Sequence, residues 1–263
     1  MGEASATGPE RREDRDPGDG VITTRALTKR YRGGQLAVDG LHLTVPAGSV
    51  FGFLGPNGSG KTTTIRMLMG ILVPSSGSVT IDGLDCQADR VELKRRVGYL
   101  PDNPVFYDYL RGREILQFVG EMHGHARPEA ERRTAMLLEQ LALDDAAEEY
   151  ATNYSAGMKK KLGLACALIH DPLVLILDEP TNGLDPRASR EVQERLRISA
   201  AQGMTIFLST HLLNMAERLC SRVGIIHKGE IVAVGPLHAL QEKVVPGGSL
   251  EEVFLKVTQE QEG

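Results

Sequence analysis

Hydrophobic positions along this chain form short alternating or fully apolar runs on either side of a central stretch with a different spacing. Short runs rich in Val, Ile, Leu and Phe, bounded by turn residues, predict strands. The predicted strands are 41–45, 50–54, 79–81, 97–100, 173–177, 205–208, 223–226 and 230–234. The run at 173–177 is apolar throughout, as expected for a strand in a parallel sheet that is covered on both faces.

In the central stretch, from about 103 to 170, apolar residues recur every three or four positions, which predicts helices. Pro128 stands where one of these helices would begin. The predicted helices here and further along the chain are 114–119, 130–141, 187–201 and 212–219. The alternation of strands and helices predicts an α/β core with an all-helical insertion at about 103–170.

Composition narrows the class of protein. Its 263 residues are 41% hydrophobic and 25% charged, as in soluble globular proteins, and no apolar run is long enough to span a bilayer. The net charge of −5 gives no reason to expect nucleic acid as a partner. The N-terminus has no apolar segment of a secretory signal. Cys86, Cys166 and Cys220 form no close pair and are expected to be buried reduced thiols of a cytosolic protein.

A glycine-rich stretch directly after the predicted strand at 50–54 fits the phosphate-binding pattern G-x-x-x-x-G-K-[ST] at every fixed position. Its residues, with the threonine that follows, are Gly55, Pro56, Asn57, Gly58, Ser59, Gly60, Lys61, Thr62 and Thr63. Glycines let backbone N–H groups point at phosphate oxygens, and the following helix adds its positive N-terminal end. Lys61 can then reach the β- and γ-phosphates, and the Thr62 hydroxyl can ligate Mg²⁺. The sequence therefore predicts a nucleoside triphosphate as ligand.

Two carboxylates, Asp178 and Glu179, follow the apolar run at 173–177. Open α/β sheets place their ligands at the carboxyl ends of such strands. One carboxylate can hold Mg²⁺, and the other can polarise the water that attacks the γ-phosphate. An acidic pair alone would indicate a solvated loop, but its combination with Lys61 favours a catalytic role.

With these motifs in this order, the chain resembles the ATP-binding cassette family, the nucleotide-binding subunits of ABC transporters, over about 21–240. The resemblance implies a mixed, mostly parallel sheet with an N-terminal antiparallel β subdomain and an inserted helical subdomain. It implies that Tyr31 stacks on adenine and that Asp185, in the D-loop, takes part in nucleotide binding. It also implies catalytic roles for Glu179, Lys61 and His211, the last as the switch histidine. Core packing for Tyr31 and helix capping for His211 remain alternatives.

The stretch 153–159, Asn-Tyr-Ser-Ala-Gly-Met-Lys, falls where the family carries L-S-G-G-Q. Ser155 and Gly157 are kept, while Leu, the first Gly and Gln are replaced. The resemblance implies that both kept residues face the ATP of a second cassette. Ser155 can cap a helix whose N-terminal amides would point at that γ-phosphate. The lysines at 159–161 are expected to lie mostly on a solvated face, because consecutive helical residues point in different directions.

Asp102 stands where the family commonly has Gln, and a carboxylate there can ligate Mg²⁺ or orient water. Some exporter-type cassettes have an acidic residue at this place. The segment 249–255 resembles a short helix that ends many exporter-type cassettes. Both features favour export as the direction of transport.

Aromatic residues gather just beyond Asp102. Tyr99, Phe106, Tyr107 and Tyr109 are four of the chain's six Tyr and six Phe. The family docks a polytopic membrane permease here, so the resemblance implies that 99–110 is the docking region. Burial in the core is the alternative, because aromatic residues are common in both environments.

The resemblance thus implies an ATPase that uses ATP and Mg²⁺, pairs with a second cassette as a homodimer or heterodimer, and drives a separate permease from the inner face of the cell membrane. The expected organisation is a disordered tail at 1–20, an ATP-binding domain at 21–245 and a short C-terminal helix and tail at 246–263. A translation factor would be expected to have two cassettes, and a DNA-repair relative a long coiled coil. A noncatalytic ATP switch remains an alternative.

Overall fold

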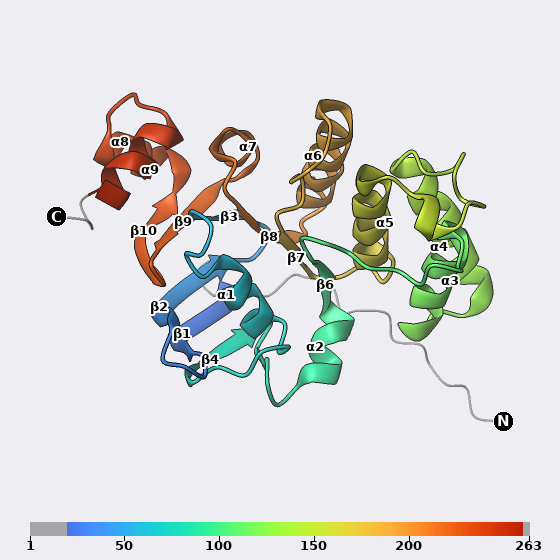
Figure 1. Ribbon diagram of the computed structural model, residues 1–263, viewed down its shortest axis with the longest axis horizontal. Coiled ribbons are helices and arrows are strands. Elements are labelled where there is room, and N and C mark those ends of the chain that lie inside the picture. Colours follow the sequence, from blue (N-terminus) through green and yellow to red (C-terminus); the bar gives the residue numbers. More distant parts are fainter. Residues whose placement is uncertain (1–19, 260–263) are drawn as a thin grey trace.

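The computed structural model describes residues 20–259, so the predicted tail lies outside the described residues except for Gly20. Two β-sheets with surrounding helices make up this part of the chain (Figure 1). The smaller sheet is antiparallel and has the order β2 (Leu36–Pro46), β1 (Gly20–Arg30), β4 (Ser76–Ile81) and β5 (Leu84–Asp85). The larger sheet has the order β10 (Glu230–Pro236), β9 (Arg222–His227), β3 (Val50–Leu54), β8 (Thr205–Thr210), β7 (Val174–Asp178) and β6 (Val97–Leu100).

Strand pairing confirms the expected fold class. Neighbouring strands of the larger sheet run parallel, except that β10 at one edge is antiparallel to β9. The antiparallel sheet is built mainly from the N-terminal strands β1 and β2. A mixed, mostly parallel sheet with an N-terminal antiparallel sheet is therefore observed.

The helices complete the fold. They are α1 (Lys61–Leu68), α2 (Arg90–Arg96), α3 (Gly112–Met122), α4 (Arg127–Gln140), α5 (Ala156–Leu168), α6 (Pro186–Ala201), α7 (Leu213–Leu219), α8 (Leu237–Val244), α9 (Leu250–Gln259) and a 3-10 turn at Ala151–Asn153. The structure shows α3, α4 and α5 between β6 and β7 in sequence, and Figure 1 shows them together beyond β6, with α8 and α9 at the other end. That they form a separate subdomain stays a prediction. Pro128 lies in the first turn of α4.

The central strands β3, β7 and β8 of the larger sheet are buried on both faces, which explains their apolar sequences. Val50 and Leu54 of β3 belong to one hydrophobic cluster, whereas Phe51 and Phe53 belong to the other. This alternation is the period of two that a strand imposes. Phe207 of β8 stacks on Phe51 with 5.6 Å between ring centroids and lies against Phe53 at 5.4 Å. The two clusters hold the strand ends rigidly for the site described below.

Two short helices, α2 and α8, and two strands, β1 and β5, were not predicted. α2 and α8 each bury a single side chain, Leu93 and Leu240, so their sequences carry almost no apolar periodicity. The strand β5 has two residues.

Within residues 20–259, no helix combines the length and apolar character that crossing a bilayer would require. Cys86 and Cys220 are buried free thiols, as expected, and burial raises the pKa of each to about 12. Cys166 is also a free thiol, but part of its surface is exposed. The expectation of buried thiols is thus met at two of the three positions.

Candidate nucleotide site

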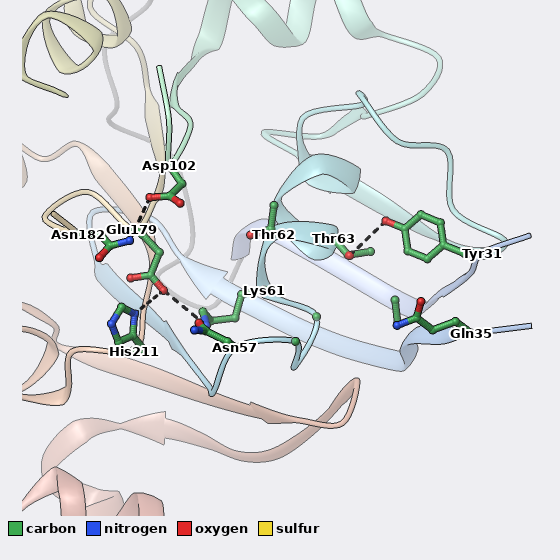
Figure 2. A pocket seen from close by; sticks show the side chains of 13 residues that line it. Tyr31, Gln35, Asn57, Lys61, Thr62, Thr63, Asp102, Glu179, Asn182 and His211 are labelled. Atoms are coloured by element: carbon green, nitrogen blue, oxygen red, sulfur yellow. Dashed lines mark hydrogen bonds and ion pairs between the residues drawn. The ribbon is translucent and has the colours of Figure 1, made fainter. Parts of the chain in front are cut away.

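A cavity of about 470 Å³ opens where the parallel strands of the larger sheet end (Figure 2). Its volume lies in the range of small-molecule sites, roughly 300–1,000 Å³. It is lined by Tyr31, Gln35, Ala37, Asn57, Gly58, Gly60, Lys61, Thr62, Thr63, Asp102, Glu179, Asn182 and His211. Most side chains predicted to handle the nucleotide within one chain therefore meet at one place.

The sheet explains this convergence. Asp102, Glu179 and His211 follow β6, β7 and β8, and the glycine-rich loop follows β3. These strands are parallel and in register, with Leu54 opposite Thr210. Parallel strands present their carboxyl ends at the same edge, so residues far apart in sequence reach one cavity.

The loop itself depends on glycine at positions where no side chain fits. Gly60 has φ 109°, and a Cβ on it would come 2.4 Å from the Ala37 carbonyl oxygen. A Cβ on Gly55 would come 2.4 Å from the Ile226 carbonyl oxygen. The loop can therefore bend tightly into α1, whose N-terminal end points its amides toward the cavity.

Lys61 is held at the bottom of the cavity. The residue is 6% exposed, and its Nζ donates hydrogen bonds to the carbonyl oxygens of Gly55 at 2.7 Å and Pro56 at 3.2 Å. Nζ also lies 3.5 Å from Glu179 Oε1. Among the described residues, the buried Ser59 hydroxyl has no hydrogen-bond partner. A fixed ammonium group that lines the cavity suits an incoming anion.

Glu179 has an unusual backbone. Its φ is 48°, the left-handed region, which costs a non-glycine residue about 1 kcal/mol or more. Hydrogen bonds from its N–H to the Ser209 carbonyl and hydroxyl, at 3.1 and 3.2 Å, support this conformation. Its Oε1 lies 3.0 Å from His211 Nδ1, and its buried Oε2 has no hydrogen-bond partner among the described residues. The carboxylate is thus oriented with one oxygen available for a ligand.

Asp178 lies beneath this group and does not line the cavity. The residue is 1% exposed, and its Oδ1 accepts a 2.5 Å hydrogen bond from the Ser209 hydroxyl. Its other oxygen and the Thr62 hydroxyl are hard oxygen donors of the kind that Mg²⁺ takes. The predicted metal role of these two residues fits their chemistry and stays a prediction.

The opposite end of the cavity comes from the smaller sheet. Tyr31 follows β1, is 36% exposed, and its hydroxyl lies 3.3 Å from Thr63 Oγ1. A ring this exposed is available for stacking and is no part of the core, so core packing does not account for it. Sequence reasoning missed Gln35, in the β1–β2 connection, and Ala37, near the start of β2, since neither belongs to a motif.

The expectation of a solvated lysine face was wrong for two of its three members. Lys160 and Lys161 are 3% and 8% exposed. Lys160 Nζ lies 3.3 Å from Asp102 Oδ1 and also donates to the Asp102 carbonyl oxygen, while Lys161 pairs with Glu191 of α6. α5 packs against β6 and α3, so its lysines are covered and find carboxylates of neighbouring segments. Asp102, a tentative metal ligand, is therefore already paired with an ammonium group.

Three predicted residues from the two helix starts after the β6 and β7 segments, Ser155, Gly157 and Asp185, do not line the cavity. Ser155 caps α5, accepting a hydrogen bond from the Met158 N–H at 3.2 Å, and it is exposed. Gly157 lies in the same first turn. Asp185 caps α6, and hydrogen bonds from the Ala188 and Arg187 N–H groups lower the pKa of its carboxyl. The predicted contact of Ser155 and Gly157 with another cassette's ATP, and the predicted part of Asp185 in nucleotide binding, stay predictions.

A second hollow, of about 560 Å³, lies in the aromatic segment after β6. Tyr107 is 68% and Tyr109 89% exposed. The hollow, called here the aromatic groove, is lined by Phe106, Tyr107, Asp108, Tyr109, Leu110 and Phe118. Phe106 is partly buried against the core, so the packing alternative holds for it but not for the two tyrosines.

Comparison with known proteins gives matches along most of the chain. A family profile described as ABC transporter matches residues 38–182. The chain is 41% identical over 233 residues to the Nod factor export ATP-binding protein I of Burkholderia lata, covering 89% of this chain and 76% of that protein. It is 40% identical over 224 residues to the bacitracin transport ATP-binding protein BcrA of Bacillus licheniformis, covering 85% and 72%.

Solved structures show the same similarity. One described as the ATP binding subunit of an ABC transporter superposes with a TM-score of 0.84 at 32% identity, covering 90% of this chain and 99% of that one. The dimeric post-hydrolysis structure of the ATP-binding cassette MJ0796, bound to ADP and Pi, superposes with a TM-score of 0.75 at 22% identity, covering 82% and 98%. The second likeness concerns the fold alone.

Proposed function

Since this chain belongs to the ATP-binding proteins of the ABC transporter family, we propose that it hydrolyses ATP to drive transport through a separate membrane-spanning permease. The contact of Glu179 with both His211 and Lys61 at the strand ends carries the proposal. A noncatalytic ATP switch would not need a carboxylate oriented in this way.

The two ends of the cavity suggest how the nucleotide lies. Tyr31 offers a ring for the adenine at the end formed by the smaller sheet. The glycine-rich loop and Lys61 would receive the phosphates in the middle. The γ-phosphate would then lie toward Glu179, His211 and Asp102, at the other end of the cavity (Figure 2).

Glu179 is the proposed general base for hydrolysis. It accepts a proton from water as the water oxygen bonds to the γ-phosphorus and the bond to the bridging oxygen breaks, which yields ADP and phosphate. His211 holds the carboxylate and, as the switch residue, senses the γ-phosphate. Lys61 stabilises negative charge on the phosphate oxygens. Mg²⁺, which Thr62 and Asp178 would hold, supplies further positive charge to those oxygens.

A second copy, or a similar cassette, is the proposed partner for the exposed end of α5. Ser155 and the amides after it form a helix N-terminus that favours an anion, yet this end lies away from the chain's own cavity. Head-to-tail pairing would bring Ser155 and Gly157 of one cassette, with Asp185 nearby, to the ATP of the other. The dimeric state of the MJ0796 cassette supports pairing of two cassettes.

Export is the proposed direction, and the inner face of the cell membrane the proposed location. The relative named for Nod factor export supports the direction. The aromatic groove, with Tyr107 and Tyr109 exposed, is the proposed docking surface for the permease. Exposed aromatic residues are typical of interface cores.

The substitution Glu179→Gln tests the proposal. Glutamine fills the same space but cannot accept the proton, so ATP turnover should fall by about 100-fold or more while ATP binding is kept. ATP-bound dimers should accumulate and be visible by size-exclusion chromatography. Glu194→Gln, at an exposed site on α6 paired with Arg197, is the control and should leave turnover unchanged. Equal turnover in the Glu179→Gln and wild-type proteins would refute the assignment.

A further inference from the structure

Asp102 brings an unusual negative charge to the end of the cavity assigned to the γ-phosphate. It lines the cavity beside Glu179 and Asn182, and its carboxylate is 37% exposed. Figure 2 shows Asp102 directed toward the Asn182 amide, which lies 3.5 Å from Asp102 Oδ1. A free carboxylate at this place would repel the phosphates that the site is proposed to bind.

Lys160 contacts the same oxygen of this carboxylate. Lys160 belongs to α5, and its side chain is 4% exposed. Its Nζ lies 3.3 Å from Asp102 Oδ1 and also donates to the Asp102 carbonyl oxygen. Burial lowers the pKa of Lys160, while Asp102, Asp178 and Glu179 act in the opposite direction. The ammonium is therefore placed where it interacts with the acidic groups of the site.

We propose that Lys160 is a positioning residue that supplies the counter-charge to Asp102, so that a carboxylate can lie beside the γ-phosphate without weakening ATP binding. This rests on the proposed function, because the phosphate end is defined by it. With the pair intact, Asp102 and Lys160 together add no net charge to the cavity. Without Lys160, one negative charge faces the triphosphate, and it repels ATP more than ADP since the γ-phosphate lies nearest.

The test is nucleotide affinity in Lys160→Gln, measured as the Kd of Mg-ATP and Mg-ADP by calorimetry on the full chain. We expect the Kd of ATP to rise about tenfold, the order expected for one partly exposed charge, and that of ADP to rise less. Lys159→Gln removes the same charge one residue earlier, where no ion pair with Asp102 is formed, and should leave both constants unchanged.

Two further variants separate charge from structure. Lys160→Gln combined with Asp102→Asn removes both charges and should restore the Kd of ATP to within about twofold of wild type, as a coupled pair requires. Lys160→Arg keeps the charge and should also stay near wild type. A purely structural role would weaken ATP and ADP alike and would not be rescued by the double substitution.

The outcomes distinguish this inference from the proposed function. Unchanged ATP affinity in Lys160→Gln, with normal binding by the wild type, overturns the counter-charge and leaves the function intact. Equal weakening of ATP and ADP also overturns it. If the wild-type chain binds no Mg-ATP, the proposed function is overturned. In that case thermal unfolding of the nucleotide-free wild type, Lys160→Gln, Asp102→Asn and the double variant still reports whether Asp102 and Lys160 are energetically coupled.

Discussion

The Lys61 end and the Ser155 end of the molecule differ in how much of the site a single chain completes. Lys61 is 6% exposed, bonded to carbonyl oxygens of its own loop and close to Glu179. Ser155 is exposed, and within residues 20–259 its hydroxyl is hydrogen-bonded only to the start of its own helix. The first region is a binding site formed almost entirely by one chain. The second is an exposed helix end that would contact ATP only when that ATP is bound to another cassette. Binding should therefore depend on the first, and turnover on both.

Removing the Lys61 ammonium is the strongest way to sharpen this difference. Lys61→Ala should raise the Kd of ATP by about 100-fold, the loss expected for a buried charged hydrogen bond, in a titration of the isolated chain. Arg66→Ala, which removes an exposed charge from the same helix α1, should leave the Kd unchanged. Unaltered ATP affinity in Lys61→Ala would mean that the cavity is not the nucleotide site.

Ser155 should have the opposite signature. Ser155→Ala should lower turnover by about tenfold at concentrations where the wild type dimerises, while ATP affinity of the isolated chain stays the same. Ser155→Asp retains a good N-cap, and so keeps the stability of α5, but places a negative charge at the helix end. It should impair turnover at least as much as alanine does. Normal turnover in both variants would show that turnover does not depend on the Ser155 end of α5.

The smallest effect on ATP affinity is expected in the aromatic groove, a third region that shares no lining residue with the nucleotide cavity. Tyr107→Ala combined with Tyr109→Ala should leave ATP affinity unchanged, because both rings point away from the core. Recovery of the membrane permease on pull-down from native membranes should fall about tenfold, as for interface anchors. Tyr150→Ala, which removes another exposed ring outside the groove, is the control. Undiminished recovery would exclude this docking surface.

The fold was predictable where side-chain spacing reflects burial. The strand at 50–54 and the helix over 187–201 match the observed β3 and α6 closely. α2 was missed because a helix that buries only Leu93 leaves no apolar period in the sequence. The error at 159–161 has a related cause. When the environment of a helix is unknown, a lysine on it is predicted to be exposed to solvent, but here neighbouring elements cover α5.

The sequence by itself determined the loop, the strands that lead into the cavity, and hence the chemistry of Lys61 and Glu179. These features depend on residues close together in the chain, where glycine geometry and hydrophobic spacing are local properties. Only the tertiary structure decided that Lys160 would meet Asp102, 58 positions away, because such a contact depends on how α5 packs against β6. Ion pairs between distant segments leave no periodic signal, since charge acts through space rather than along the chain.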